Sequence, residues 1–207
     1  MVDSILLTAG KSSRMGQDKA LLQIGEITVI EKILRVLIPI SESVNIIFSD
    51  NYELIKDHLL SSFLKLDNVH FAVNKKADLG MFSSIKKGFS VVSGKNPVLL
   101  QMIDQPFVEE EIYVELISSF DDDSLIFQPV VTINGKERIG HPILFSPGFI
   151  EKILSEPDEG NMRDLIRKFN HKRKLIPIDD ERILQNINTP EDYERTLKEI
   201  NCGNSSL

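Results

Sequence analysis

Short apolar runs alternate with stretches of helical periodicity along most of this chain. The runs that predict buried strands are Ile5 to Leu7, Val44 to Phe48, Val69 to Val73 and Pro97 to Ile103. Between them apolar residues recur at helical intervals, which predicts helices at 29–37, 52–60, 81–91 and 109–120. Alternation of this kind predicts a mostly parallel sheet that lies between helices, an α/β architecture.

Cap and turn residues mark the ends of several predicted helices. Thr28 and Glu31 have the spacing of a capping box, which predicts the start of the first helix. Pro39 is expected to stop that helix, because proline lacks the N–H that a helix interior needs. Near the other end of the chain, Pro190 behind Thr189 predicts the first residue and the N-cap of a last helix, which runs to residue 200.

The second half of the chain departs from simple alternation. Two apolar runs, 125–133 and 140–145, flank Asn134-Gly135, which is typical of a tight hairpin turn. Two short helices at 149–154 and 162–169 and a strand at 174–178 follow. No repeat, linker or low-complexity segment interrupts the chain, so we predict one domain over residues 1–200 and a flexible tail at 201–207.

Composition narrows the class of protein. The 207 residues include 31 acidic and 24 basic side chains, for a net charge of −7, and 42% are hydrophobic. An acidic balance argues against a nucleic-acid partner. No apolar stretch is long enough to span a bilayer, and the N-terminus lacks the basic region of a signal peptide. The single cysteine, Cys202, forms no internal disulfide. We expect a cytoplasmic protein with no membrane partner.

A loop rich in Gly, Ser and basic residues follows the first predicted strand. It begins at Thr8 and holds Arg14 and Lys19. Open α/β sheets bind ligands at the carboxyl ends of their strands, and small residues let backbone N–H groups approach phosphate oxygens. Gln17 follows Gly16 where a Walker A loop needs Lys. The loop therefore predicts a phosphate site of another type, and a basic surface loop is the alternative.

Two polar residues are candidates for a metal site. Asp104 comes directly after the strongest predicted strand, and Mg²⁺ takes one or two hard oxygen ligands from a protein, with the rest from phosphates and water. The alternative for Asp104 is an Asx turn that ends the strand. Asn188 could offer a second oxygen, or Asn188 and Thr189 could simply cap the last helix.

Two further segments carry candidate binding residues. Gly80 and Ser83 stand ahead of a predicted helix, where backbone N–H groups can hold a phosphate, although a helix start looks the same without a ligand. His141, between Gly140 and Pro142, could donate to a substrate, but a lone histidine is usually structural. The basic run at 163–174 is expected to be a solvated face.

Taken together and in order, these segments resemble the MobA-like NTP transferase family, which includes the molybdenum cofactor cytidylyl- and guanylyltransferases. The resemblance spans nearly the whole chain and implies a three-layer α/β/α domain, Rossmann-like, of the nucleotide-diphospho-sugar transferase type. The segments that carry it are Leu7-Thr8-Ala9-Gly10 to Lys19, Gly80-Met81-Phe82-Ser83-Ser84, Asp104-Gln105-Pro106, Gly140-His141-Pro142 and Asn188-Thr189-Pro190-Glu191-Asp192-Tyr193.

The resemblance implies a Mg²⁺-dependent nucleotidyl transfer, in which an acceptor phosphate attacks an NTP and pyrophosphate leaves. Asp104, with Asn188, would hold the metal, and His141 would face the acceptor. Arg14, Lys19 and Asp104 would carry the reaction. The residues implied for nucleotide binding are Leu7, Thr8, Ala9, Gly10, Lys19, Gly80 and Ser83.

The resemblance also bears on the two substrates. Ala9-Gly10, Gly80-Met81 and Gly140-His141-Pro142 are similar to the cytidylyl branch and favour CTP, with molybdopterin as the acceptor. Asn186 and Asn188 are similar to the guanylyl branch, which leaves GTP open. Two other readings also remain open: a transferase that acts on a sugar or polyol phosphate, and a non-catalytic protein that carries a cofactor.

Overall fold

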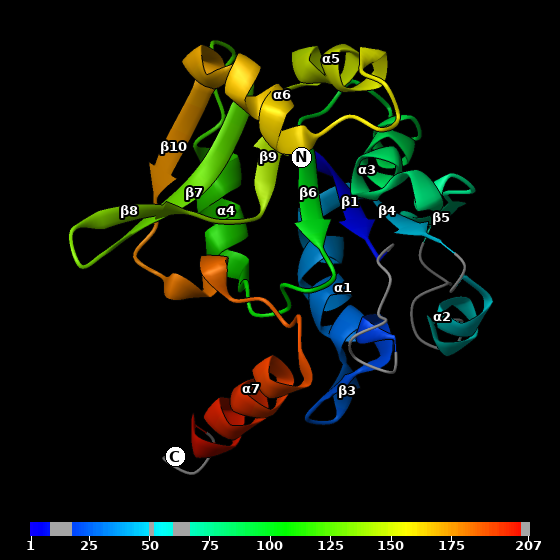
Figure 1. Ribbon diagram of the computed structural model, residues 1–207, viewed down its shortest axis with the longest axis vertical. Helices are drawn as coiled ribbons and strands as arrows, with labels where there is room; N and C mark the ends of the chain where they lie inside the picture. Colours follow the sequence, from blue (N-terminus) through cyan, green and yellow to red (C-terminus); the bar gives the residue numbers. More distant parts are fainter. Residues whose placement is uncertain (9–17, 50–51, 60–66, 204–207) are drawn as a thin grey trace.

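The computed structural model describes residues 1–8, 18–49, 52–59 and 67–203, with the backbone alone described at 199–203. Its centre is a sheet in the order β10-β7-β9-β6-β1-β4-β5, with β8 added beside β7 (Figure 1). The strands β1, β4, β5, β6, β7 and β10 are mutually parallel, and only β8 and β9 run against them. This arrangement confirms the predicted mostly parallel sheet.

Most predicted strands lie close to their expected places, but β8 at 136–139 closes the hairpin after β7, and only 143–145 of the predicted run at 140–145 form a strand, β9. The strands of the sheet are β1 (Val2–Leu7), β4 (Ser41–Phe48), β5 (Val69–Val73), β6 (Val98–Met102), β7 (Ile126–Ile133), β8 (Lys136–Ile139), β9 (Ile143–Phe145) and β10 (Arg173–Pro177). Residues of β1 and β6 are buried on both faces, which explains their nearly continuous apolar sequence. The turn between β7 and β8 has positive φ at both Asn134 and Gly135, as an Asn-Gly hairpin requires.

Helices cover both faces of the sheet and complete three layers. On one face, α1 (Val29–Ile40), α2 (Tyr52–Leu59) and α4 (Glu110–Ser118) pack against one apolar cluster. On the other, α3 (Met81–Phe89), α5 (Ile150–Ser155) and α6 (Met162–Lys168) pack against a second cluster. The alternation of strand side chains decides the face, so Leu6 belongs to the first cluster and Leu7 to the second.

The helix starts follow the predicted caps, with one correction. Thr28 and Glu31 form both hydrogen bonds of a capping box at the start of α1. Pro39 does not stop that helix, which continues to Ile40 before β4 begins. Pro39 stands in the last turn and is exposed. Water can therefore hydrogen-bond to the Arg35 carbonyl, which lacks an N–H partner from residue 39.

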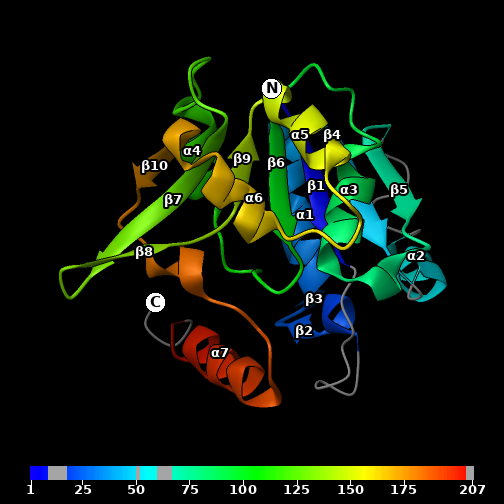
Figure 2. The same cartoon turned by 45° about the horizontal axis from the view of Figure 1, so that its top comes forward.

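The last helix, α7 (Pro190–Gly203), lies beyond the carboxyl ends of β1 and β6, away from the sheet (Figures 1 and 2). Thr189 caps it as predicted, because its hydroxyl accepts the N–H of Asp192 at 3.1 Å. The Tyr193 hydroxyl donates to the carbonyl of Gln23 at 2.6 Å. That bond joins α7 to the hairpin of β2 (Gln23–Ile24) and β3 (Ile27–Thr28), which the sequence pattern did not indicate. The helix reaches three residues into the segment predicted as a tail.

Candidate functional site

The order of the strands reverses beside β1. The chain goes from β1 outward to β4 and β5, and then returns to the opposite side of β1 to form β6. Ligands in open α/β sheets bind at such a switch point, outside the carboxyl ends of the strands. The N–H of Ile103 donates to the carbonyl of Leu7 at 3.0 Å, so the segments that leave β1 and β6 start side by side. Both predicted site segments therefore emerge at the switch point.

The turn that carries Asp104 is held by a buried glutamine. Gln101 is fully buried in β6, and its amide nitrogen donates to the carbonyls of Met102 and Gln105, each at 2.9 Å. The amide oxygen of Gln101 accepts the hydroxyl of Tyr113 in α4 at 2.9 Å. The nitrogen and the oxygen of the Gln101 side-chain amide therefore both have hydrogen-bond partners. The network orients the residues between Met102 and Gln105, and Asp104 is one of them.

Asp104, Lys19 and Asn188 lie together, although they are far apart in the sequence. The Asp104 carbonyl accepts the N–H of Ile187 at 2.8 Å, which brings the segment before α7 to the end of β6. In the next residue, the amide oxygen of Asn188 accepts a hydrogen bond from Nζ of Lys19 at 2.9 Å. Lys19 begins a short 3₁₀ helix, η1 (Lys19–Leu21), whose N-cap is Asp18. Three predicted site residues thus come from three segments.

The surroundings of Asp104 shift the pKa of its carboxyl in two opposite directions. Burial raises the pKa of the Asp104 carboxyl, because the charged form loses solvation. The positive charge of Lys19 offsets part of that rise. A half-buried carboxylate beside an ammonium group is suited to bind another cation or to sit against a phosphate that carries its own counter-charge.

A cavity of about 1000 Å³ opens beside Asp104, between the sheet and the α3 and α6 helices. Its wall combines apolar side chains with a few polar ones, as ligand sites do. Asp104, Gly80 and His141 all line it. The apolar part of the wall includes Phe82, Leu100, Met102, Ile143, Met162 and Ile166.

Gly80 lies on the wall of this cavity, but the Ser83 hydroxyl is already engaged. Gly80 has φ +106°, a conformation that favours glycine, and it stands at the N-terminus of α3. Ser83 is buried, donates to the carbonyls of Lys76 and Gly80, and accepts from the side-chain amide of Asn74 at 2.9 Å. The Ser83 side chain therefore holds the turn before α3, and any contact with a nucleotide falls to the backbone of this turn.

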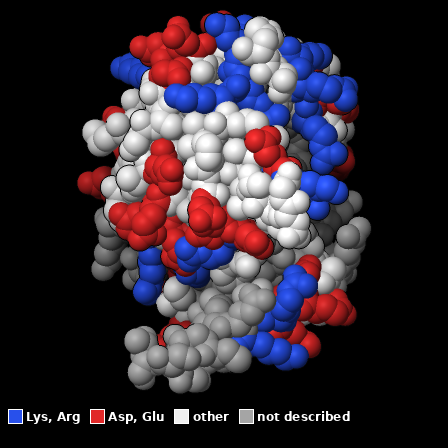
Figure 3. Space-filling model, turned by 90° about the vertical axis from the view of Figure 1, so that its left-hand side faces the viewer, with Lys and Arg blue, Asp and Glu red and all other residues white. Residues whose placement is uncertain are grey.

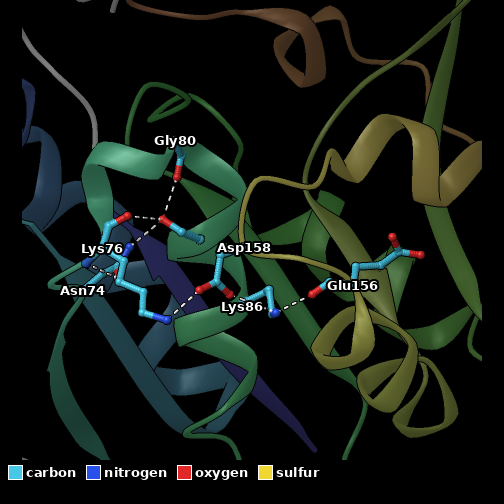
Figure 4. A network of polar contacts seen from close by, with 7 residues as sticks. Asn74, Lys76, Gly80, Lys86, Glu156 and Asp158 are labelled. Atoms are coloured by element: carbon cyan, nitrogen blue, oxygen red, sulfur yellow. Dashed lines mark hydrogen bonds and ion pairs between the residues drawn. The ribbon is translucent and has the colours of Figure 1, made fainter.

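Ion pairs tie the same turn to the loop between α5 and α6 (Figure 4). Asp158 accepts from Lys76 at 2.7 Å and from Lys86 at 2.9 Å; Lys76 begins the turn before α3, and Lys86 lies in α3. Lys86 also donates to the carbonyl of Glu156. These contacts lower the pKa of Asp158, above all through its hydrogen bond with Lys76. The loop that carries Gly160 and Asn161, both on the cavity wall, is thus fixed to α3.

His141 lies on the cavity wall, two residues before β9 begins. Its backbone N–H donates to the carbonyl of Ile183, and its Nδ1 is buried with no partner in the described structure. Burial lowers the pKa of His141 to about 4, so the ring is neutral at pH 7. The position agrees with a role toward the acceptor, which stays a prediction.

The other predicted nucleotide contacts divide into two groups. Thr8 is described, and its N–H and its hydroxyl both donate to the carbonyl of Ile47, at 3.0 and 2.9 Å. Leu7 is buried, and its carbonyl accepts from Ile103. These two residues anchor the end of β1. The remaining predictions, Ala9, Gly10 and Arg14, lie outside the described residues.

The donor set at the switch point fits a cation that is shared with phosphates. Among the described residues, no group of three or more His, Cys, Asp or Glu side chains could hold a metal ion by itself. Asp104 and Asn188 offer one carboxylate and one amide oxygen, which is the small protein contribution that Mg²⁺ usually takes in phosphate-transfer sites. The residues present therefore fit a metal that a bound triphosphate helps to hold.

Basic side chains gather on the side of the molecule near α6. Figure 3 shows basic side chains across the upper part of that side, with an acidic cluster beside them and more acidic side chains below. The basic residues of this region are Arg163, Arg167, Lys168, Lys172, Arg173 and Lys174. Most are solvent-facing, as predicted, but Arg163, Arg167 and Arg173 also line the cavity. No helix in the described part of the chain is long and apolar enough to cross a membrane.

Several residues of the site were not found from the sequence. Gln101, Tyr113, Gln128, Asp158 and Arg173 each contribute through partners or neighbours that are distant in the chain. The one signal in the sequence that could have indicated them is a glutamine inside an apolar run that predicts a buried strand, as in β6 and β7. An amide in a buried strand needs partners and so marks a position with a polar task.

Fold and site together define a three-layer α/β domain. Its switch point carries polar side chains that are suited to a nucleotide, and a cavity lies beside them. A family model, the MobA-like NTP transferase domain, matches residues 4–174, and the chain belongs to this family. The resemblance inferred from the ordered motifs is confirmed.

Two named relatives match almost the full length of this chain. A probable molybdenum cofactor guanylyltransferase of Flavobacterium johnsoniae is 27% identical over 195 residues, which cover 91% of this chain and 93% of the relative. The molybdenum cofactor cytidylyltransferase of Escherichia coli K12 is 26% identical, and the match covers 93% of each chain. The two differ in the nucleotide that their names specify, so similarity does not select between CTP and GTP.

Solved structures share the fold. The structure from Mycobacterium sp. strain JC1, described as a homologue of a Mycobacterium tuberculosis protein, has a TM-score of 0.80 and 24% identity, with 97% of each chain covered. A structure from Mycobacterium tuberculosis H37Rv in complex with manganese has a TM-score of 0.72 and 19% identity, with 95% of this chain and 98% of that chain covered. These matches confirm the Rossmann-like architecture.

Proposed function

We propose that this protein transfers a nucleotidyl group from an NTP to the phosphate of molybdopterin and releases pyrophosphate. The observation that carries the proposal is the meeting of Lys19, Asn188 and Asp104 at the switch point, beside a cavity large enough for an acceptor. Membership in the MobA-like NTP transferase family and the names of the two relatives support the same reaction.

The reaction needs one bond to form and one to break. An oxygen of the acceptor phosphate forms a bond to the α-phosphorus of the NTP, while the bond between that phosphorus and the bridging oxygen to the β-phosphate breaks. Negative charge grows on the pyrophosphate that leaves. Lys19 would stabilise that charge, together with Arg14 from the N-terminal loop. A divalent cation held by Asp104 and Asn188 would neutralise part of the phosphate charge, as manganese or magnesium can.

Other residues of the chain hold Asp104, Asn188 and Lys19 in position. Gln101 and Tyr113 fix the turn that holds Asp104, and the cap of α7 fixes Asn188. Because Asn188 accepts from Lys19, it orients the ammonium group toward the phosphates whether or not it also binds a metal. Preorganised charges of this kind lower a barrier most, since they need no rearrangement during the reaction.

We propose CTP as the nucleotide. Ala9 before Gly10 and the Gly80-Met81 and Gly140-His141-Pro142 segments support this choice. GTP is the second candidate, and a specific observation favours it. Asn186 and Asn188 stand where the guanylyl branch carries asparagines, and the Flavobacterium johnsoniae relative is named for guanylyl transfer.

A thermal-shift panel tests the nucleotide first. The protein is melted with each of the four NTPs, with and without Mg²⁺. A ligand that binds only the folded state raises the melting temperature by mass action, by several degrees at one hundred times Kd, where the stabilisation is about 2.7 kcal/mol. We expect a Mg²⁺-dependent rise that is largest with CTP. A rise that is largest with GTP transfers the assignment to the guanylyl branch, and no rise with any NTP contradicts the proposed function.

A further inference from the structure

The cavity beside Asp104 collects nearly all of the unsatisfied polar atoms of the described interior. In the described interior, five buried side-chain atoms have no hydrogen-bond partner. Four of the five belong to residues on the cavity wall: Gln105 Oε1, Gln128 Oε1, His141 Nδ1 and Arg173 Nε. A buried polar atom without a partner is costly, and native proteins keep few of them. Their concentration in one cavity indicates that a ligand supplies the missing partners.

The register of the sheet spreads three of these side chains along the cavity, with Gln128 and Arg173 farther from the switch point than His141. In the parallel pairing of β10 with β7, Arg173 lies opposite Ile126 and Leu175 opposite Gln128. Side chains two residues apart share a face, so Gln128 and Arg173 face the same side of the sheet as Ile126, toward α5 and α6. Ile143 of β9 lies opposite Leu100 of β6 in an antiparallel pair, so His141, two residues earlier, lies level with Met102 and nearer the switch point.

The three side chains offer a mixed set of donors and acceptors. Arg173 can only donate, and the free oxygen of Gln128 can only accept. The His141 ring is neutral at pH 7, because burial lowers its pKa to about 4, so one ring nitrogen accepts and the other donates. A site for a bare anion would present donors alone. This set instead matches a planar ring whose edge carries a carbonyl next to N–H and amino groups.

The walls of the cavity fit a flat ring of that kind. Phe82, Met102 and Met162 are apolar side chains with broad faces, and they line the same space. The charged side chains of the lining are Asp104 at the switch point and Arg163, Arg167 and Arg173 on the α6 side. A ligand that reaches the switch point with its phosphate therefore has an apolar passage and then a polar, positively charged end for its ring.

We propose that Gln128, His141 and Arg173 form the recognition site for the pterin ring of the acceptor, and so act as specificity-determining residues. The proposal rests on the proposed function, since it assigns the part of the acceptor that lies farthest from the transferred phosphate. The ring carbonyl accepts from the Arg173 guanidinium, and the ring N–H and amino groups donate to Gln128 and His141. Small rotations of the side chains bring these atoms to the ligand.

Binding of 6-hydroxymethylpterin, followed by its own fluorescence, tests the assignment in the full chain. We expect wild-type protein to bind this probe, and Arg173→Met and Gln128→Leu to weaken binding at least about ten-fold each, the effect of one buried hydrogen bond. Arg138→Met is the matched control, because Arg138 lies in β8, is exposed and does not line the cavity. It should bind the probe as wild type does.

A stability measurement separates recognition from a structural role. Gln128→Leu removes a buried acceptor that has no partner, so the melting temperature should stay level or rise by about 2–4 °C while pterin affinity falls. A structural glutamine would instead lower both. Nucleotide binding, measured by the same NTP thermal shift, should be unchanged in both variants.

Three results would overturn the assignment. One is a wild-type protein that does not bind the pterin probe, and another is a set of variants that bind it as tightly as wild type. The third is displacement of the probe by inorganic phosphate together with equal loss of phosphate binding in Arg173→Met, which indicates an anion site. Failure of the proposed function is separate: the pterin probe then binds, but molybdopterin with an NTP gives no pyrophosphate.

Discussion

Lys19 is the cationic residue that lies nearest to the predicted metal ligands in the described structure. Its ammonium group donates to Asn188 and offsets part of the rise that burial causes in the pKa of Asp104, so it lies among the groups that would meet the phosphates. We expect Lys19→Met to reduce the rate of pyrophosphate release by about 10²–10³-fold, the usual effect of removing one preorganised charge. Lys95→Met is the control, because Lys95 is an exposed lysine elsewhere on the surface. A Lys19→Met protein that keeps more than a tenth of the rate would remove Lys19 from the mechanism.

Tyr113 acts at the site through Gln101. Its buried hydroxyl donates to the Gln101 amide, which in turn holds the Asp104 turn, and burial raises the pKa of Tyr113 so that it stays protonated. Tyr113→Phe leaves the Gln101 oxygen buried without a donor. We expect unfolding in urea to show a loss of about 1–3 kcal/mol and the turnover rate to fall. Tyr52→Phe should change neither, since Tyr52 lies in α2 and packs on Phe48, outside this network.

At the scale of an element, the start of α7 decides where Asn188 lies. The Asp192 carboxylate accepts the N–H groups of Asn188 and Thr189, at 3.1 and 3.0 Å. We expect Asp192→Ala to lower stability by about 1 kcal/mol, the usual value of a helix cap, and to raise the KM for NTP as Asn188 loosens. Glu194→Ala, an exposed change in the same helix, should leave KM unaltered. An unchanged KM in Asp192→Ala would show that the cap does not position Asn188.

The loop between α5 and α6 approaches α3 so closely that glycine is required at residue 160. A Cβ added to Gly160 would stand 2.7 Å from the Phe82 ring and 2.9 Å from the Pro157 carbonyl. Gly160→Ala should therefore destabilise the fold by about 1–3 kcal/mol in chemical denaturation. Gly148→Ala is the matched control, because its nearest atom would be an ordinary contact at 3.5 Å. Equal stability of the two variants would contradict the packing described for this loop.

Elements were predictable where the pattern is local. Thr28 and Glu31, or Asn134-Gly135, determine a cap or a turn by themselves, and the apolar runs of β1, β4 and β6 are buried on both faces. The β2–β3 hairpin was missed, because each strand has two residues and no period can develop. Helix α1 passes Pro39, because exposure of the last turn lets water replace the lost hydrogen bond.

Part of the candidate site could also be predicted from local sequence patterns. Lys19, Asp104 and Asn188 each stand near the end of an element with a chemically distinct neighbourhood, and the switch point brings such ends together. Gln128 and Arg173 could not be found in this way. They come to the same face of the sheet only through the register of β10 on β7, which depends on the whole second half of the sheet.

At the scale of the whole molecule, His141 links stability to pH. Its pKa is about 4 in the folded protein and near 6.5 when unfolded, because burial disfavours the charged ring. Between these values the unfolded chain binds more protons, so His141 lowers stability as pH falls from 6.5 to 4. His141→Leu should remove this loss and gain roughly 2–3 kcal/mol relative to wild type over that range. Parallel pH profiles of the two proteins, from urea melts, would contradict a buried neutral ring.

Transfer of a nucleotide to the phosphate of molybdopterin at the switch point can be measured directly. The direct measurement supplies purified protein with molybdopterin, Mg²⁺ and each NTP in turn, and records pyrophosphate and the mass of the pterin product. We predict one pyrophosphate for each dinucleotide formed, with CTP the best donor, and loss of both products in a folded Asp104→Asn variant. Absence of pyrophosphate with every NTP, or equal activity in Asp104→Asn, would contradict the account.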